Sequence, residues 1–495
     1  MNRLAGSRAG RWAGVTWGAF ALGSGGAFAS SCSPAILVSW AVVVAGSALI
    51  AAALSARWVA AVLIVGTSVG LGVLRGATAI ATPGPGSIDG NFGTRPLVVL
   101  GTVRSADPGS GSSAIVDATR LSDADVDRAV TGGVLVSGPL IPALSPGDAV
   151  EIDAAGLRPL DRRPGPDSEA TLEREDVEGI ASSPQVFVLT PGGPSLPRSV
   201  AWVQSRLIAA VDRALPEPAA ALVIGVAFGI HQPLTTDVRT PLQDAGLIHI
   251  VVVSGLKVVL VLGLVRALGR VFEWSRRRSV LTAVPLVAAY VLVSGAGPAA
   301  IRSALMAGAA LLADTGARRT DPLPMLALSA ALMLGIAPEL VEDPGFQLSF
   351  LGTAGILLLA SPIATRIRGP RLLVEPFAVT LAAQLATLPV MASTFGVVAL
   401  AGPIANAVVL PLLPLMIVAG GSGAILGAIH PAIGWLPLQV AGLGTSVIMA
   451  VARLVNALPG AAIQLGSWPA SWSIAEVAGL LAASAVAALA ARAPR

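Results

Sequence analysis

The sequence predicts a polytopic α-helical membrane protein of about 12 spans, with a small all-β extracytoplasmic domain inserted after the first spans. Two observations predict this class. Of the 495 residues, 54% are apolar and 12% are charged, and the mean hydropathy is +0.78, whereas soluble domains carry about 25% charged residues. Residues 82–197 hold 16 acidic and 8 basic residues, while the rest of the chain is strongly basic. This asymmetry indicates a soluble insertion between membrane-embedded parts.

Residues 1–81 are predicted to form about three N-terminal transmembrane spans. Apolar runs cover 12–30, 34–54 and 58–74, and three arginines precede the first run. A cleaved signal peptide is the rival interpretation of that first run. A retained span is preferred because two further runs follow at once. With basic loops kept inside, the N-terminus is cytoplasmic and the acidic segment lies outside.

The segment 82–197 is predicted to be the extracytoplasmic β domain. It opens with a Pro- and Gly-rich linker and contains five short apolar or alternating runs: 97–104, 114–121, 133–137, 149–157 and 185–189. Turn clusters separate them, so a small OB-like barrel is expected, with a generic β-sandwich fragment as the alternative. Residues 159–180 are expected to form an acidic insertion with a short helix at 169–177. OB folds often bind single-stranded nucleic acid, but the negative charge here favours a scaffold or gate.

Residues 198–235 form the third unit, an amphipathic helix at 198–215 followed by a short apolar segment at 219–229. Eleven residues are too few to cross about 30 Å of hydrocarbon as a helix, so this segment is expected to be partial or re-entrant. The fourth unit, 236–495, contains the remaining predicted spans: 249–265, 279–294, 298–313, 322–337, 346–362, 375–395, 399–419, 432–457 and 473–491. Basic loops place both termini in the cytoplasm and the chain in the plasma membrane.

Lys257, the only lysine in the chain, lies about halfway along the predicted span 249–265. A lone charge in hydrocarbon costs roughly 2.5–3.5 kcal/mol on insertion scales, so such a residue marks a functional site by default. Cations that line a pore are a common device for passing anions. The alternative is a lysine that reaches the membrane surface or pairs with an acid on another span. Arg302 is a second intramembrane cation, placed just after Gly295-Ala-Gly-Pro298.

Other polar residues lie in or beside the predicted spans, next to Pro and Gly that break helices. Irregular backbone at membrane depth is tolerated where it is buried or lines a cavity, so these positions are candidates for a polar pathway. For each of them, hydrogen bonding between helices is the alternative. The candidates besides the two cations are His249, Ser254, Gly255, Gln347, Ser349, Gln384 and Asn406.

Enzymatic activity is not expected, and no cofactor or metal is expected. The sequence has no Gly-x-x-x-x-Gly-Lys-Ser/Thr loop for ATP. Its one Gly-x-Ser-x-Gly match, Gly66-Thr-Ser-Val-Gly70, lies inside the predicted span 58–74 rather than at a strand-to-helix turn, where the nucleophile motif of hydrolases is found. Its three histidines are far apart, without metal-ligand spacing, and its one cysteine excludes an intramolecular disulfide.

Five ordered motifs resemble those of the ComEC competence family. They are Leu242-Gln-Asp-Ala-Gly-Leu-Ile-His-Ile-Val-Val-Val-Ser-Gly-Leu-Lys257, Gly297-Pro-Ala-Ala-Ile-Arg302-Ser-Ala-Leu-Met306, Asp343-Pro-Gly-Phe-Gln-Leu-Ser-Phe350, Gln384-Leu-Ala-Thr-Leu-Pro389 and Pro403-Ile-Ala-Asn406. The family usually has histidine at the position of Lys257, and lysine stays charged where histidine titrates. The chain resembles the form that lacks the C-terminal metallo-β-lactamase-like domain of many members.

The resemblance implies an inner-membrane channel that passes single-stranded DNA into the cytoplasm during natural transformation, with 236–495 as the channel domain. It also implies a cytoplasmic ATPase as the motor, a periplasmic or surface DNA receptor, and a nuclease on a separate protein. Lys257 and Arg302 are expected to meet the DNA backbone. Ser254, Gln347, Gln384 and Asn406 are expected to supply hydrogen bonds that do not depend on base sequence. Two alternatives stay open: a permease for a smaller anion, and a membrane scaffold that transports nothing.

Overall fold

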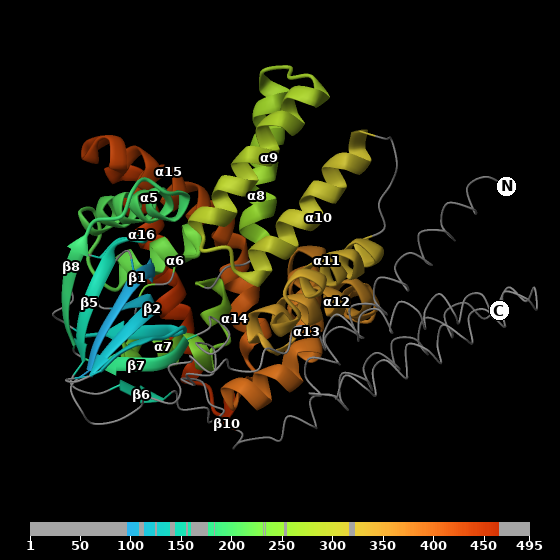
Figure 1. Ribbon diagram of the computed structural model, residues 1–495. Coiled ribbons are helices and arrows are strands. Elements are labelled where there is room, and N and C mark those ends of the chain that lie inside the picture. The colour runs from blue at the N-terminus through green and yellow to red at the C-terminus, as the bar shows by residue number, and fades with distance from the viewer. Residues whose placement is uncertain are drawn as a thin grey trace, which may run out of the picture.

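The computed structural model divides the chain into a β-sheet part and a helical part (Figure 1). It describes residues 97–107, 113–123, 126–138, 144–154, 157–159, 177–182, 184–230, 232, 234–251, 255–315 and 322–464. The predicted N-terminal spans within 1–81 and the predicted span 473–491 lie outside these residues.

The β part is one sheet, for which the described residues provide eight strands. Their order is β6-β7-β4-β2-β1-β5-β8, and β3 pairs with β2. All pairs are antiparallel except β4 with β7. The strands are β1 (Leu97–Ala106), β2 (Ser113–Asp123), β3 (Val126–Ala129), β4 (Gly133–Ser137), β5 (Ala149–Ala154), β6 (Leu157–Pro159), β7 (Val177–Ser182) and β8 (Gln185–Thr190).

Alternating β-branched residues explain why this segment forms strands with one buried face. Val99 and Val103 of β1, Val116 of β2 and Ile152 of β5 are almost wholly buried in one core. Between the two β1 valines lies Gly101, where a Cβ atom would overlap the backbone oxygen of Asp117 on β2. Glycine is therefore required at this point, and the β1–β2 register shifts between Leu100 and Gly101.

Two of the sequence predictions for this part are wrong. The run 149–157 is not one strand, because β5 pairs with β1 and β8 while β6 pairs with β7. The acidic insertion was predicted to extend to residue 180, but Val177 and Ile180 are buried members of β7. Residues 160–176, which include most of the predicted short helix, lie outside the described residues. An OB-like closure of the sheet stays a prediction.

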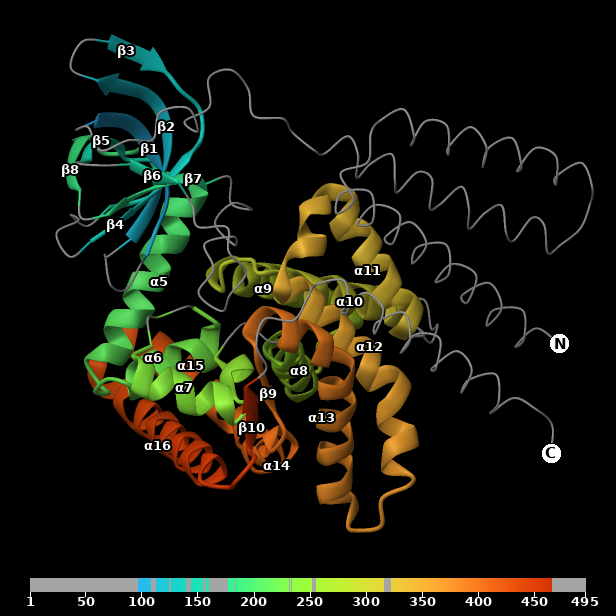
Figure 2. The same ribbon diagram turned by 90° about the horizontal axis from the view of Figure 1, so that it is seen from below.

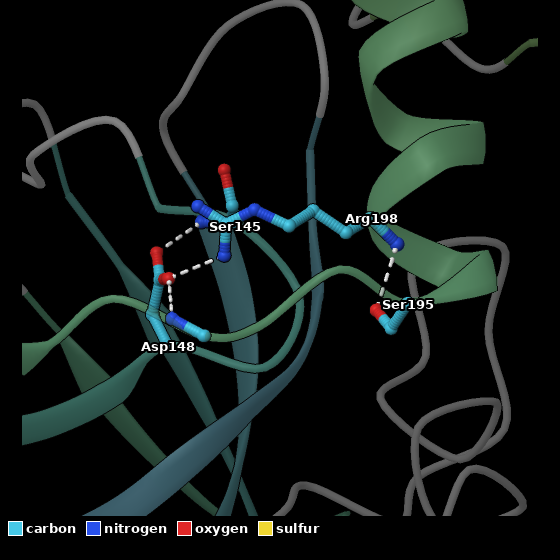
Figure 3. A network of polar contacts seen from close by, with 5 residues as sticks. Ser145, Asp148, Ser195 and Arg198 are labelled. Atoms are coloured by element: carbon cyan, nitrogen blue, oxygen red, sulfur yellow. Dashed lines mark hydrogen bonds and ion pairs between the residues drawn. The ribbon is translucent and has the colours of Figure 1, made fainter.

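A polar junction joins the sheet to the first helix of the helical part, α5 (Leu196–Asp212) (Figure 3). The Asp148 carboxylate accepts hydrogen bonds from the N–H groups of Ser145 and Gly192 and from Nη1 of Arg198, at 2.9, 2.8 and 2.7 Å. Ser195 caps α5 by accepting from the Arg198 N–H. Burial raises the pKa of the Asp148 carboxyl, but these donors and the guanidinium charge outweigh it and hold that pKa below its ordinary value of 3.8.

The helices next to α5 form the first of two helical groups (Figure 2). The buried face of α5 (Leu207, Ile208, Val211) packs in one core with α6, α15 and α16, and a second core joins α6 and α7 to α14, α15 and α16. This group contains α6 (Ala219–Phe228), α7 (Thr236–Asp244), η2 (Ile248–Ile250), β9 (Val397–Ala399), α14 (Gly402–Val409), η5 (Leu410–Leu412), α15 (Leu413–Ile429), α16 (Pro431–Asn456) and β10 (Ala462–Gln464). β9 and β10 pair with each other.

The second group contains two sets of helices, and the α8–α9 hairpin projects furthest from the body in Figure 1. One core joins α8, α9 and α10, and a smaller one joins α11 to α12. The elements are α8 (Gly255–Val271), α9 (Arg276–Val293), α10 (Pro298–Thr315), α11 (Pro322–Ile336), η3 (Pro338–Glu342), α12 (Pro344–Ala364), α13 (Arg371–Val390) and the π-helical turn η4 (Met391–Phe395).

Three helical segments in the described part are long and apolar enough to cross a membrane: Pro344–Ala364, Gly402–Ile429 and Pro431–Asn456. The second is a broken helix composed of α14, η5 and α15. It agrees with the alternative to a span at 399–419, which was one long broken helix over 399–428. Shorter apolar helices include Pro298–Leu311, Pro322–Ile336 and Val374–Val390. The chain is thus a helical membrane protein with a β-sheet domain, and the total of about 12 spans stays a prediction.

Candidate polar pathway

The candidate site begins at the C-terminal end of α6, a ten-residue helix in which every residue but Ala219 is more than nine-tenths buried. Gly229 ends this helix in the left-handed conformation, with φ of 76°, and its N–H donates to the Gly225 oxygen. Nζ of Lys257 donates to the same oxygen at 2.6 Å. The hydroxyl of Tyr290 on α9 donates to the Phe228 oxygen at 3.3 Å. The end of α6 is buried, and there Lys257 adds a second donor to the Gly225 oxygen while Tyr290 donates to the Phe228 oxygen, one of the last carbonyls of the helix.

Lys257 is 1% exposed and is the largest fully buried side chain among the described residues. Its predicted place in the middle of a helical span is wrong, because α8 begins at Gly255 and Lys257 therefore lies in its first turn. His249 lies in the separate turn η2, and Ser254 lies outside the described residues. A cation next to the C-terminal end of α6 is electrostatically favourable, because that end of a helix carries partial negative charge.

Arg302, on the first turns of α10, is the second buried cation and is 8% exposed. Its Nε donates to Oγ of Ser349 on α12 at 2.8 Å, and its Nη1 lies 3.4 Å from Sδ of Met306. Its Cζ lies 5.9 Å from the centroid of the Phe350 ring, within the range of a cation–π contact. Within the described ranges, no carboxylate pairs with this guanidinium.

Close packing brings the Arg302 side chain against the start of α8. A Cβ atom on Gly255 would overlap Oγ of Ser303 and would lie 2.9 Å from Nη2 of Arg302. Gly225 is similarly close to its neighbour, since a Cβ there would overlap the Val251 side chain. The structure therefore brings Gly255, Arg302 and Ser349 together where α10 packs against α8 and α12. Lys257, two residues after Gly255, contacts the end of α6 instead.

Gln384 and Asn406 belong to a second polar group around β9 and the start of α14. Nε2 of Gln384 donates to the Ala399 oxygen at 2.6 Å, and its Oε1 would lie 3.2 Å from a Cβ on Gly402. Asn406 follows Gly402 by one helical turn and is 3% exposed. Its Oδ1 is buried without a hydrogen-bond partner in the part of the chain that the structure describes.

The remaining candidates make local contacts. Nδ1 of the exposed His249 lies 3.0 Å from the Gly246 oxygen. A Cβ atom on Gly246 would lie 3.0 Å from Cβ of Ala399 and 3.3 Å from Cα of Gly402, beside the second polar group. Nε2 of Gln347 donates to the Val341 oxygen six residues earlier, at 2.7 Å. This contact ties the start of α12 to the adjoining turn η3, so it is a local bond and not the bond between helices that was the alternative for this residue.

Sequence analysis missed three residues of the site: Gly225, Tyr290 and Ser303. Tyr290 is the only tyrosine in the chain, and a lone phenol in an apolar helix signals a buried hydrogen bond. Ser303 follows Arg302 directly and donates to the Ala299 oxygen at 2.7 Å. Gly225 contributes only a backbone oxygen, for which the sequence holds no signal. Among the described residues no cluster of metal-ligating side chains is found.

Buried cations near helix ends and long apolar helices define the class, a helical membrane protein with charged side chains buried between its helices. Over residues 226–490 the chain matches the family model described as "Competence protein". This chain belongs to the competence protein family, as its resemblance to ComEC predicted. It is 27% identical over 225 residues to ComE operon protein 3 of Bacillus subtilis (strain 168). That alignment covers 45% of this chain and 28% of the relative's length. No solved structure matches the chain.

Proposed function

We propose that this protein is a plasma-membrane channel that passes single-stranded DNA into the cytoplasm during natural transformation. Membership of the competence protein family supports a role in DNA uptake. The observation that carries the finer proposal is Arg302, a buried guanidinium for which the described residues offer a hydroxyl, a thioether and a ring but no carboxylate. Such a cation is costly unless an anion visits it, and the phosphates of a DNA strand are anions of the required kind.

In this proposal the Arg302 site, where α10 packs against α8 and α12, is the narrow part of the pathway. Arg302 presents planar N–H donors that match phosphate geometry. Ser349 orients the guanidinium, and Gly255 leaves room for it at the start of α8. Gln384 and Asn406 provide polar groups that do not read base sequence. The driving force comes from a partner ATPase, because the chain itself is proposed to catalyse no reaction.

The test is the entry of labelled DNA into cells in which Arg302→Gln replaces the wild-type gene. Glutamine keeps polar atoms but removes the charge, so we expect uptake to fall by about tenfold or more. The conservative Arg302→Lys keeps the charge and loses the planar fork, and it should retain part of the uptake. Membrane content of each variant is measured by immunoblot, so that loss of the protein is not mistaken for loss of transport.

Arg453→Gln is the matched control, because Arg453 lies at the exposed last turn of α16. Its uptake should equal that of the wild type. Normal uptake by Arg302→Gln at normal protein level would contradict the proposed pathway. Loss of mononucleotide import with normal strand uptake would indicate a permease for small anions. Normal DNA entry after deletion of the whole gene would favour a scaffold with another task.

A further inference from the structure

The turn between α8 and α9 is stabilised by backbone hydrogen bonds, and its left-handed position is taken by a glutamate rather than a glycine. The Trp274 N–H donates to the Gly269 oxygen at 2.7 Å, and the Glu273 N–H donates to the Arg270 oxygen at 3.4 Å. These two bonds form a Schellman motif, in which Glu273 takes the left-handed position with φ of 48°. Ser275 then caps α9 by accepting from the Arg278 N–H. The turn therefore holds its side chains in fixed positions.

This turn and its flanks, residues 266–278, concentrate basic and aromatic residues, and we name them the hairpin tip. The tip carries five arginines and one acid, Glu273. The arginines are Arg266, Arg270, Arg276, Arg277 and Arg278. All of them except Arg276, whose side chain is not described, are exposed. Phe272 is 64% exposed, and its ring stacks on that of Trp274 with centroids 6.2 Å apart.

Exposed apolar side chains run along both helices toward the hairpin tip. On α8 they are Val259, Leu264, Leu268 and Val271, and on α9 they are Leu281, Val284, Leu286 and Leu292. Apolar side chains that face outward on a membrane protein face lipid, and aromatic rings gather where lipid meets water. The tip therefore lies where the apolar surface of the hairpin ends, at the level of the headgroups.

We propose that the hairpin tip is a binding site for anionic phospholipid headgroups. Clusters of four to eight basic residues next to a membrane helix attract anionic lipid, and guanidinium groups bind phosphate oxygens through paired N–H donors. The stacked Phe272 and Trp274 rings anchor the site at the interface. The apolar rows on α8 and α9 favour lipid over nucleic acid as the occupant. This site is independent of the proposed DNA pathway.

The experiment titrates purified full-length protein in detergent with fluorescently labelled phosphatidylglycerol and, separately, with labelled phosphatidylcholine. Wild-type protein should bind the anionic lipid more tightly. The double variant Arg277→Gln/Arg278→Gln should lose about tenfold or more of that affinity, while Arg277→Lys/Arg278→Lys should keep most of it. Binding of phosphatidylcholine should not change in either variant.

The matched control is Arg366→Gln/Arg368→Gln, which removes two exposed arginines from the loop between α12 and α13. It should bind phosphatidylglycerol as the wild type does. Unchanged affinity in the tip variant, or equal loss in the control, would overturn the proposal, the latter by showing general charge attraction. A tip variant that loses affinity for a labelled single-stranded oligonucleotide but keeps its affinity for phosphatidylglycerol would overturn it in favour of nucleic acid.

Discussion

At the scale of residues, the two buried cations are held in different ways. Lys257 is a compact ammonium placed on a carbonyl at the negative end of α6, 2.6 Å from the Gly225 oxygen. Arg302 is a planar guanidinium held by one hydroxyl and one aromatic ring. Lys257 therefore stabilises the end of α6 in addition to any contact with an anion. The contacts of Arg302 include no negatively charged group among the described residues, so its positive charge is available to an anionic ligand. This difference is why Arg302 is the sharper test of transport.

Gly255 gives a test of how tightly this site is packed. Gly255→Ala should lower the stability of the protein by about 1–3 kcal/mol, because the new Cβ would overlap Ser303 Oγ and crowd Arg302. Gly263→Ala, on the same helix with nothing within 4 Å of the new Cβ, should be neutral or stabilising by about 0.5–1 kcal/mol. Thermal unfolding in detergent measures both. Equal stability of the two variants would show that α8 does not pack as described.

At the scale of elements, the Asp148 junction fixes the direction in which α5 leaves the sheet. Asp148 lies in the turn before β5, Gly192 follows β8, and Arg198 is in the first turn of α5. One carboxylate thus connects the turn before β5 to the stretch 192–198, which begins 44 residues later in the sequence (Figure 3). Its side chain is only 6% exposed, so the ion pair is screened by solvent less than most surface pairs.

The junction predicts a pH-dependent loss of stability. A carboxyl whose pKa is lowered on folding stabilises the protein above its ordinary pKa of 3.8, and that contribution is lost as the pH falls through the lowered value. Asp148→Asn should therefore cost roughly 1–2 kcal/mol at neutral pH, and its deficit should shrink as the medium is acidified. Hydrogen exchange of the first turn of α5 reports the change locally. Asp153→Asn, on the exposed side of β5, should show no deficit, and a pH-independent deficit in Asp148→Asn would contradict the account.

The hydropathy pattern predicted the strands in which apolar and polar residues alternate. It missed strands that form only because they pair with other strands. β1, β2, β4 and β8 follow period-two runs in the sequence, so their positions were predicted. β7 (Val-Glu-Gly-Ile-Ala-Ser) follows an acidic stretch, and it forms a strand because it pairs in parallel with β4 and antiparallel with β6. Such pairing is set by tertiary contacts, which short-range patterns do not report. The same limit explains the Gly225 oxygen, a backbone acceptor 32 residues before Lys257.

At the scale of the whole molecule, the acidic sheet and the basic hairpin tip lie on different parts of the structure (Figure 1). By the rule that basic loops stay inside, the acidic segment 82–197 and the basic segment 266–278 are expected to face opposite sides of the membrane. The ordered motifs predicted the family, which is confirmed. They named Gly255, Lys257, Arg302 and Ser349 as candidates without predicting which of them lie together. The motifs did not predict that Gln347 forms its hydrogen bond within its own segment. A sequence motif identifies residues, but it does not show which atoms they bond.

Opposite sidedness is testable by cysteine labelling. In a Cys32→Ser background, Thr190→Cys on the exposed end of β8 should react with a membrane-impermeant maleimide in intact cells. Glu273→Cys in the exposed α8–α9 turn should react only after the membrane is permeabilised. Full labelling of both positions in intact cells would refute the proposed orientation, while the variant without cysteine controls for background reaction.

The length of α6 is expected to restrict insertions and deletions in homologous genes. One inserted residue would turn the end of this helix by about 100° and move it by about 1.5 Å. The Gly225 and Phe228 oxygens would then point away from Lys257 and Tyr290. Insertions and deletions in homologous genes should therefore accumulate in loops and be purged from the codons for residues 219–228, even where substitutions there are tolerated.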